Sequence, residues 1–347
     1  MAAGKHMINL ALQGGGAHGA FTWGVLDCLL EDGRIGIEAL SGTSAGAVNG
    51  AVLIDGYMRG GEDGARQALH DLWEEIAKIG ALSPIQRSPL DIWQGNYSLD
   101  HNPAYLFFDV LTRMASPYDL NPANANPMRD LLERLVDFEK VRSCSDVKLF
   151  ISATNVHTGR VKVFHGGEVS LDAVMASSCL PLLFQAVEIE GVPYWDGGYM
   201  GNPVLFPFFY HCESEDILLV QINPMERNET PKTSRDIHNR LNEITFNASL
   251  NKELRAIEFV SRLIETENLS EETYKRVRMH MIEADDELAS LSASSKLNAE
   301  WKFLRHLHDI GRRTAADWLD RNFASIGKKS TFDLGEYFKG TRIEGEI

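Results

Sequence analysis

Residues 8–31 read INLALQGGGAHGAFTWGVLDCLLE, and this stretch decides the fold. The apolar run at 8–12 predicts a buried strand, which leads directly into a loop rich in glycine. After that loop, apolar residues recur at helical spacing over 20–31. A strand, a glycine loop and a helix in this order indicate the start of a layered α/β fold.

A serine follows the second expected strand. Residues 35–40 predict a short strand, 45–57 predict a helix, and Gly42-Thr43-Ser44-Ala45-Gly46 lies at their junction. A serine at a sharp strand-to-helix turn holds its hydroxyl clear of the backbone, and only very small residues fit at the flanking positions. Gly42 and Gly46 meet that need, so Ser44 is a candidate nucleophile. The pentapeptide alone is a weak signal, because its residue types are common.

Periodicity predicts further elements along the chain. Apolar runs predict two paired strands around a turn at 157–159, a core strand at 217–222 and another strand at 277–282. Helical spacing predicts one short helix and two long amphipathic helices. The paired strands are 147–153 and 160–164, and the helices are 170–178, 234–267 and 297–323.

Residues 80–127 have a different composition, with six prolines among aromatic residues. One interpretation is an irregular connection that covers the core, and the other is a lid or a wall that holds acyl chains. The sequence leaves both open. The residues concerned are Pro84, Pro89, Pro103, Pro117, Pro122, Pro127, Trp93, Tyr97, Tyr105, Phe107, Phe108 and Tyr118.

Composition limits the classes of function. The chain has 347 residues, enough for one large α/β domain or two smaller ones, and a formal net charge of −15. That charge argues against an extended nucleic-acid interface and against general adsorption to an anionic membrane, although a local apolar patch could still touch lipid. The four cysteines are far apart, which predicts reduced thiols rather than disulfides or a zinc site. The apolar run at 8–12 is too short for a secretory signal or a bilayer span, so we expect a cytoplasmic protein.

The first glycine loop has two interpretations. Gly14, Gly16 and Gly19 satisfy the dinucleotide-binding pattern G-x-G-x-x-G between a strand and a helix. Backbone N–H groups in such a loop point at negative charge, which belongs either to a pyrophosphate or to the oxyanion of a reacting ester. A dinucleotide site also needs an acid at the end of the second strand, whereas here Glu38 lies inside that strand and Ser44 follows it. The context therefore favours an oxyanion hole.

Asp196-Gly197-Gly198 supplies a candidate general base. Paired glycines after an acid allow a tight turn that carries the carboxylate to the reactive atom of another loop. Taken alone, an Asp-Gly pair is more often the start of a turn that has no catalytic role.

Four motifs in order resemble the patatin-like phospholipase family. They are the glycine loop, the serine pentapeptide, residues 176–184 (ASSCLPLLF) and Asp196-Gly197-Gly198, and the resemblance covers roughly residues 8–207. It implies a three-layer α/β/α sandwich with a mostly parallel central sheet. We expect a catalytic domain at 8–225 and, beyond the resemblance, a helix-rich C-terminal extension at 226–347 that packs on it.

The resemblance also implies a serine–aspartate dyad without histidine. Ser44 would attack the ester carbonyl, Asp196 would take its proton, and water would hydrolyse the resulting acyl-enzyme. The oxyanion hole would consist of Gly14, Gly15 and Gly16, with the N–H groups of Gly15 and Gly16 as donors and Gly14 shaping the loop. No metal and no other cofactor is expected. The supporting motif residues are Gly19, Gly42, Gly46, Gly197 and Gly198.

The expected reaction is hydrolysis of an acyl ester of a glycerophospholipid or lysophospholipid. Neutral lipids and short hydroxyalkanoate esters are alternative substrates, because the motif residues touch only the ester. A nucleotide-binding module that uses residues 14–19 is a more remote alternative. The sequence leaves open the head group, the chain length, the positional preference, regulation, the oligomeric state and transient contact with a lipid surface.

His18 departs from the family pattern, which commonly has arginine or lysine at this place in the glycine loop. His18 could stabilise the loop or contact an anion, or it could simply be a residue at the start of the helix. A Ser-Asp-His triad is the rival mechanism, because five histidines follow Asp196 in the order that α/β-hydrolases use. None of them lies in a glycine-framed loop, so we expect surface or core residues at His211, His238, His280, His306 and His308.

Overall fold

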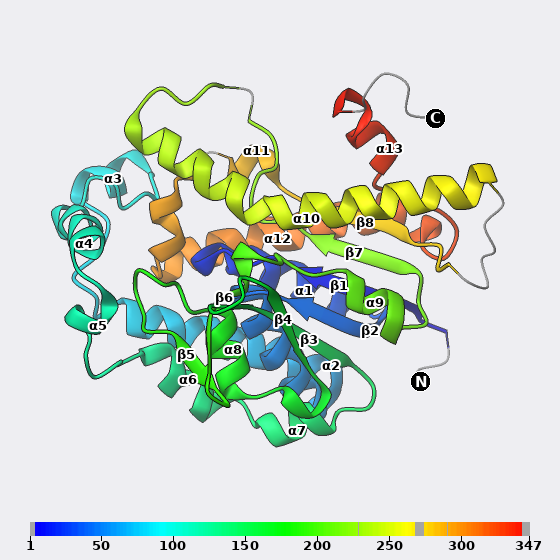
Figure 1. The fold of residues 1–347 in the computed structure, drawn as a ribbon, viewed down its shortest axis with the longest axis horizontal. Coiled ribbons are helices and arrows are strands. Elements are labelled where there is room, and N and C mark those ends of the chain that lie inside the picture. Colours follow the sequence, from blue (N-terminus) through cyan, green and yellow to red (C-terminus); the bar gives the residue numbers. More distant parts are fainter. Residues whose placement is uncertain (1–3, 228, 268–273, 290, 342–347) are drawn as a thin grey trace.

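The computed structural model describes residues 4–227, 229–267, 274–289 and 291–341. Its centre is an eight-stranded sheet with the order β5-β6-β3-β2-β1-β7-β8, and β4 pairs with β3 (Figure 1). The strands β3, β2, β1, β7 and β8 are parallel, whereas β4 and β6 run antiparallel to β3 and β5 runs antiparallel to β6. The bounds are β1 (His6–Leu12), β2 (Ile35–Gly42), β3 (Lys148–Asn155), β4 (Val161–His165), β5 (Val187–Ile189), β6 (Val192–Asp196), β7 (Asp216–Val220) and β8 (Arg278–Ile282).

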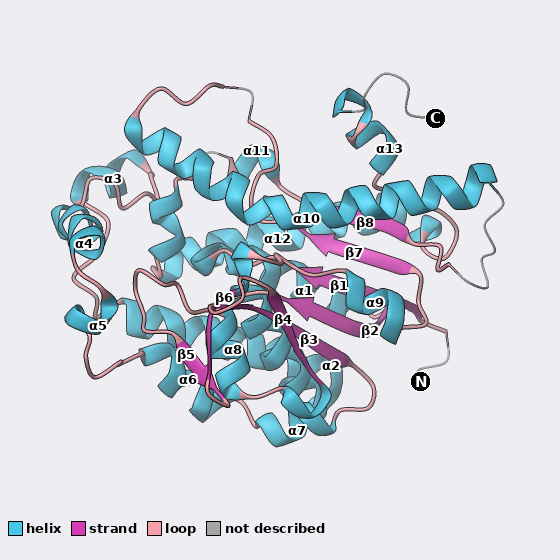
Figure 2. Ribbon diagram, viewed as in Figure 1, coloured by secondary structure: helices cyan, strands magenta, loops and turns pink. Residues whose placement is uncertain are grey.

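Helices cover both faces of the sheet (Figure 2). In β1, Leu10 and Leu12 belong to one apolar core and Ala11 belongs to the other, so alternate residues face opposite layers. The first layer contains α1 (Gly19–Asp32), α2 (Ala45–Gly80), α6 (Pro127–Leu135), α7 (Phe138–Ser143), α8 (Leu171–Ser177) and α12 (Trp301–Asn322). The second contains α9 (Phe206–His211), α10 (Ser234–Glu267) and α13 (Leu334–Tyr337). This arrangement confirms the expected α/β/α sandwich with its mostly parallel sheet.

Most elements predicted from periodicity are present. All the predicted strands are found within one or two residues of their expected ends, as are α1, α8 and α10, whereas α12 begins four residues late. The helix predicted at 45–57 is longer, because α2 continues to Gly80 across a kink where Gly60 and Gly61 are not helical. The hairpin of β5 and β6 has no counterpart in the sequence prediction, although β6 ends at Asp196.

The first interpretation of 80–127, an irregular connection, is wrong in its secondary structure, and the second, a lid or acyl-chain wall, stays a prediction. The segment forms α3 (Pro89–Gln94), α4 (Pro103–Met114) and α5 (Pro117–Leu120), and α6 begins at its end. Each of these four helices has proline in its first turn. The side chain of the residue before each proline accepts a backbone N–H from the first turn, which has no acceptor within the helix. Proline suits the first position because it has no N–H that needs an acceptor there. The capping residues are Ser88, Asn102, Ser116 and Asn126.

Residues after 225 contribute to the same sheet and the same cores as the residues before them. β8 pairs with β7 over five residue pairs, and Phe303, Leu304 and Leu307 of α12 are fully buried in the core that α1 and α2 share. The 3-10 helix η4 (Ala293–Leu297) packs against η1 (Gly16–His18) of the first glycine loop. The division into 8–225 and 226–347 stays a prediction.

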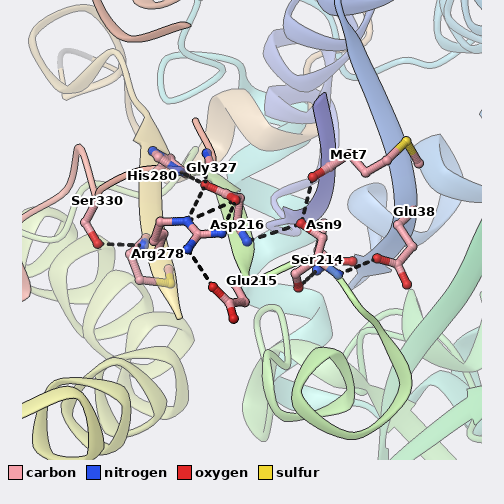
Figure 3. A network of polar contacts seen from close by, with 11 residues as sticks. Met7, Asn9, Glu38, Ser214, Glu215, Asp216, Arg278, His280, Gly327 and Ser330 are labelled. Carbon is pink, nitrogen blue, oxygen red and sulfur yellow. Dashed lines mark hydrogen bonds and ion pairs between the residues drawn. The ribbon is translucent and has the colours of Figure 1, made fainter. Parts of the chain in front are cut away.

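A polar network joins β7, β8 and the C-terminal segment at the amino ends of the strands (Figure 3). Asp216, the first residue of β7, accepts hydrogen bonds from Arg278 of β8 and from the backbone N–H of Gly327 at 2.9 Å. The Nε2 atom of His280 lies 2.9 Å from the same carboxylate. Burial opposes ionisation of Asp216, but these partners outweigh it and hold the pKa of Asp216 below its ordinary value.

Candidate active site

Ser44 lies at the turn between β2 and α2. Its φ of 52° and ψ of −121° form a backbone conformation that residues with a side chain rarely adopt. A residue of another helix stabilises the turn: Ser44 N–H donates a hydrogen bond to Ser177 Oγ of α8 at 2.8 Å. Ser44 is only partly buried, which leaves it accessible to a substrate. Such a strained turn after a strand is typical of a catalytic nucleophile.

Gly42 and Gly46 allow β1, β2 and α2 to approach closely. A Cβ atom on Gly42 would lie 2.6 Å from the backbone of Gly46, and one on Gly46 would collide with the carbonyl oxygen of Leu12. A Cβ atom on Gly19, at the start of α1, would lie 2.7 Å from the Ala45 side chain. Backbone packing therefore requires glycine on both sides of Ser44.

Asp196 is the last residue of β6 and is fully buried. It pairs with Ala153 of β3, and β3 also pairs with β2, where Ile151 is the partner of Gly42. The sheet thus brings the end of β6 close to the turn that carries Ser44. Asp196 Oδ1 accepts a hydrogen bond from Gly198 N–H at 2.7 Å, whereas Oδ2 makes no regular hydrogen bond with any described residue.

The two glycines after Asp196 lie in tight packing. A Cβ atom on Gly197 would collide with the backbone of Ser152 in β3, and one on Gly198 would collide with the ring of Phe246 in α10. Gly198 is also the residue whose N–H holds the carboxylate. Both glycines therefore position Asp196.

The ionisation of Asp196 is shifted toward neutral pH. Burial raises its pKa to about 7, while the Gly198 N–H, the Ser44 side chain and the charge of Lys296 act in the opposite direction. Ser44 is therefore close enough to influence the carboxyl group. A carboxylate with such a pKa can both accept and return a proton near pH 7.

The first glycine loop lies directly against Ser44. A Cβ atom on Gly14 would lie 2.7 Å from Ser44 Cβ. Gly14 N–H is already engaged, because it donates to Asn202 Oδ1 at 2.7 Å. In contrast, the N–H groups of Gly15 and Gly16 have no acceptor within the part of the chain that the structure describes. Two unpaired donors beside a serine suit a developing oxyanion, with Gly14 shaping the loop rather than donating.

His18 is buried and neutral near pH 7. Burial and the charge of Lys296 lower its pKa to about 3. Its Nε2 atom lies 2.8 Å from Ser295 Oγ, and its side chain makes no capping hydrogen bond to α1. These contacts favour a role in holding the loop over contact with an anion.

Four polar residues around the site were not identified as functional from the sequence. They lie outside the motif positions that were given a role, and they are Ser177, Asn202, Asn223 and Lys296. Asn223 follows β7 by three residues, so the carboxyl end of a predicted core strand could have pointed to it. Lys296 has no local sequence signal, because only the packing of η4 brings it to the site.

The histidines do not form a triad with Ser44 and Asp196. None of those in the described ranges hydrogen-bonds either residue. A buried arrangement that resembles a triad does occur, since His280 lies between Asp216 and Thr331, whose Oγ1 is 2.9 Å from Nδ1. It includes Asp216, the first residue of β7 (Figure 3), whereas Ser44 follows the carboxyl end of β2 at the opposite end of the parallel strands.

No cluster of three or more histidine, cysteine or acidic side chains that could hold a metal ion occurs in residues 4–227, 229–267, 274–289 and 291–341. Cys28, Cys144, Cys179 and Cys212 form no disulfide in the structure, and Cys28 and Cys179 are buried.

The model of the patatin-like phospholipase family matches residues 10–209. That span is more than half of the chain, and it contains both glycine motifs, Ser44 and Asp196. The chain belongs to the patatin-like phospholipase family. Membership supports lipid acyl hydrolase activity in general.

Among solved structures, the chain is similar to VipD from Legionella pneumophila. The identity is 15%, the TM-score is 0.36, and the match covers 88% of this chain and 67% of that chain. No curated protein sequence matches. Within the patatin-like family match, Asn202 is included, but Asn223 and Lys296 lie beyond its end.

Proposed function

We propose that the chain hydrolyses acyl esters of glycerophospholipids or lysophospholipids through a Ser44–Asp196 dyad. The supporting observation is the convergence of three groups on one spot: a serine in a strained turn, a buried carboxyl group with an unpaired oxygen, and two unpaired N–H donors at Gly15 and Gly16. Each group alone also occurs in proteins that catalyse nothing. Together they are the nucleophile, base and oxyanion hole of acyl transfer.

The reaction begins when Ser44 Oγ attacks the ester carbonyl carbon and its proton passes to the Asp196 carboxylate. The N–H groups of Gly15 and Gly16 hold the oxyanion, and losing one such donor typically costs about 3 kcal/mol of transition-state stabilisation. Collapse of the intermediate expels the alcohol, which takes the proton from Asp196. Water then attacks the acyl-enzyme, Asp196 takes its proton, and the released Ser44 recovers one.

The lipid substrate class is further supported by an apolar surface on α3, α4 and α5, which we call the cap face. Trp93, Phe107 and Met114 are 83%, 68% and 81% exposed. These helices lie beyond the carboxyl ends of the central strands (Figure 1), and Leu99 N–H donates to Ser294 Oγ of η4 at 3.0 Å. Trp and apolar side chains bury favourably at the surface of a bilayer or micelle.

The cap face is proposed to contact uncharged or zwitterionic lipid. The net charge of −15 disfavours an anionic surface. Every helix in the described ranges is either too short or too polar to span a bilayer. In this proposal the exposed side chains of the cap face make the contact.

The nucleotide-binding alternative lacks its acidic residue. Glu38 accepts hydrogen bonds from the backbone N–H groups of Glu213 and Ser214 at 2.8 and 2.7 Å, and Lys148 is a further partner. Its carboxylate is thus already occupied and does not face the glycine loop. Neutral lipids and short hydroxyalkanoate esters stay as alternative substrates, since the same three groups would cleave them.

A hydrolysis panel tests the proposal. Phospholipids, lysophospholipids, triglycerides and short p-nitrophenyl esters are compared for the parent chain and Ser44→Ala, and both are exposed to a fluorophosphonate. We expect turnover of phospholipid or lysophospholipid and labelling only in the parent. Equal turnover in Ser44→Ala would refute the dyad, and nucleotide binding without labelling would favour the binding module.

A further inference from the structure

The 3-10 helix η4 closes over the first glycine loop. The carbonyl oxygen of Lys296 packs against Gly16, where a Cβ atom would lie 2.5 Å from it, and Gly16 has a φ of 58°. The neighbouring Ser295 Oγ lies 2.8 Å from His18 Nε2. His18 and Ser295 are 277 positions apart in the sequence, so a distant segment of the chain forms one wall of the proposed oxyanion hole.

Asn223 connects Lys296 to the peptide between Gly14 and Gly15. Lys296 Nζ donates to Asn223 Oδ1 at 2.7 Å, and Asn223 Nδ2 donates to the carbonyl oxygen of Gly14 at 2.8 Å. Asn223 is fully buried, and its backbone N–H donates to Gln13 Oε1 at 3.0 Å, which holds it in place.

The orientation of the Gly15 donor follows from these contacts. In a trans peptide, C=O and N–H point in opposite directions. Binding of the Gly14 carbonyl oxygen by Asn223 therefore turns the Gly15 N–H away from Asn223 and leaves it without a protein acceptor among the described residues. On the other side, Asn202 holds the Gly14 N–H.

Lys296 also brings positive charge to the dyad. Its Nζ lies 5.7 Å from the centre of the Phe246 ring, and that ring packs on Gly198 beside Asp196. The charged groups that act on Lys296 are Glu243 of α10, Asp196 of β6 and Arg227 of the loop after β7. His18 faces it as a neutral ring.

We propose that Lys296 and Asn223 are positioning residues of the oxyanion hole, and that Lys296 is the cation beside the glycine loop, in which His18 is neutral. Lys296 holds Asn223, Asn223 orients the Gly14–Gly15 peptide, and the charge of Lys296 favours both the oxyanion and the ionised form of Asp196. This inference rests on the proposed function.

Ionisation gives the proposal a signature that a purely structural role would lack. Burial lowers the pKa of Lys296 to about 8, and its charge is one of the influences that lower the pKa of Asp196. Cys179 and Tyr199 also lie near Asp196, and their pKa values are raised by burial. Removing the Lys296 charge should therefore move the acidic limb of the pH–rate profile to higher pH and abolish an alkaline limb near pH 8.

The experiment compares Lys296→Met, Lys296→Arg and Asn223→Ala in the full chain, with Lys302→Met as a control that removes an exposed lysine of α12. Initial rates on a soluble p-nitrophenyl ester are measured from pH 5 to 10. We expect Lys296→Met and Asn223→Ala to lower kcat about 10- to 100-fold with KM changed less than about threefold. Of the three variants, only Lys296→Met should move the acidic limb of the pH–rate profile to higher pH. Lys296→Arg should keep the acidic limb at the parental pH but lose the alkaline limb.

The proposal would be overturned if Lys296→Met kept the kcat and the pH–rate profile of the parent. It would also be overturned if Lys302→Met lost as much kcat as Lys296→Met. If circular dichroism shows that Lys296→Met does not fold, the parent and Lys296→Arg are compared instead. An alkaline limb near pH 8 that is present in the parent and absent in Lys296→Arg would support the proposal, and its absence from the parent would refute it. A different result would refute the proposed function itself: Ser44→Ala would keep its activity. An inactive Ser44→Ala with an unaltered Lys296→Met would refute only the role of Lys296.

Discussion

Two buried aspartates of the same sheet differ in almost every respect except residue type. Asp196, at the end of β6, is fully buried, receives one backbone N–H and leaves Oδ2 unpaired, and its pKa is raised to about 7. Asp216, at the start of β7, is 3% exposed and meets Arg278, His280 and a backbone N–H, and its pKa is lowered.

The difference shows how the surroundings of a carboxyl group separate a reactive role from a structural one. A buried polar atom without a partner costs stability, so its persistence suggests that function maintains it. Asp216 with His280 and Thr331 looks more like a catalytic triad than Asp196 does, but its partners already satisfy it.

Ser44→Ala and Asp196→Asn should have the largest effect. Each removes one member of the proposed dyad, so we expect the rate of ester hydrolysis to fall by roughly 10⁴-fold or more, while the fold is retained. Steady-state assays and circular dichroism measure the two quantities. Ser178→Ala is the matched control, because its hydroxyl, just after the end of α8, donates to the carbonyl oxygen of Val174. A comparable loss in the control would point to disturbed packing.

Asp216→Asn should reverse the pattern, with a loss of stability and little loss of activity. Breaking a buried ion pair from one side leaves Arg278 without its main partner and typically costs about 3 kcal/mol or more of unfolding free energy. Urea denaturation measures this cost. Asp196→Asn should be no less stable than the parent. A stable Asp216→Asn chain that has lost its activity would contradict the structural assignment.

The two aspartates should also give opposite dependence of stability on pH. Asp216 has a lowered pKa, so its contribution is present above its ordinary pKa of 3.8 and is lost as pH falls through its folded-state pKa. Asp196 has a raised pKa, so the folded state holds a proton that the unfolded state releases, and stability falls as pH rises from 3.8 to about 7.

Urea unfolding at a series of pH values measures both trends, and Asp196→Asn should remove only the second. Activity should follow the ionised fraction of Asp196, so kcat/KM should drop about tenfold per unit below about pH 7. A rate that is flat between pH 5 and 7 would exclude Asp196 as the base.

The cap face should show the smallest effect, because it touches neither aspartate. Trp93→Ala with Phe107→Ala should change the unfolding free energy by less than about 0.5 kcal/mol, since both side chains are exposed. Hydrolysis of a soluble ester should be unchanged, whereas hydrolysis of phosphatidylcholine vesicles should fall about three- to tenfold. Tyr210→Ala on α9, 78% exposed, is the control. An equal loss on both substrates would argue against surface contact.

Much of the proposed site was predictable because its parts are local. The strand, glycine loop and helix at 8–31 and the turn at Ser44 each depend on residues within a few positions of one another. The helices at 80–127 were also readable, since Ser88-Pro89 and Asn102-Pro103 are a capping residue followed by a first-turn proline. The prolines and aromatic residues instead left two interpretations open, an irregular connection and a lid or acyl-chain wall.

What the sequence alone determined is the order of the motifs around Ser44 and the layered fold, because glycine spacing and apolar periodicity act over short distances. Only the tertiary structure decided how those motifs are surrounded. Lys296 reaches Asn223 across 73 positions, and Asn223 reaches Gly14 across 209. The raised pKa of Asp196 arises mainly from burial. Burial and charge are properties of the packed chain, so the sequence could nominate Asp196 through the two glycines that follow it, but it could not predict the opposite pKa shifts of Asp196 and Asp216.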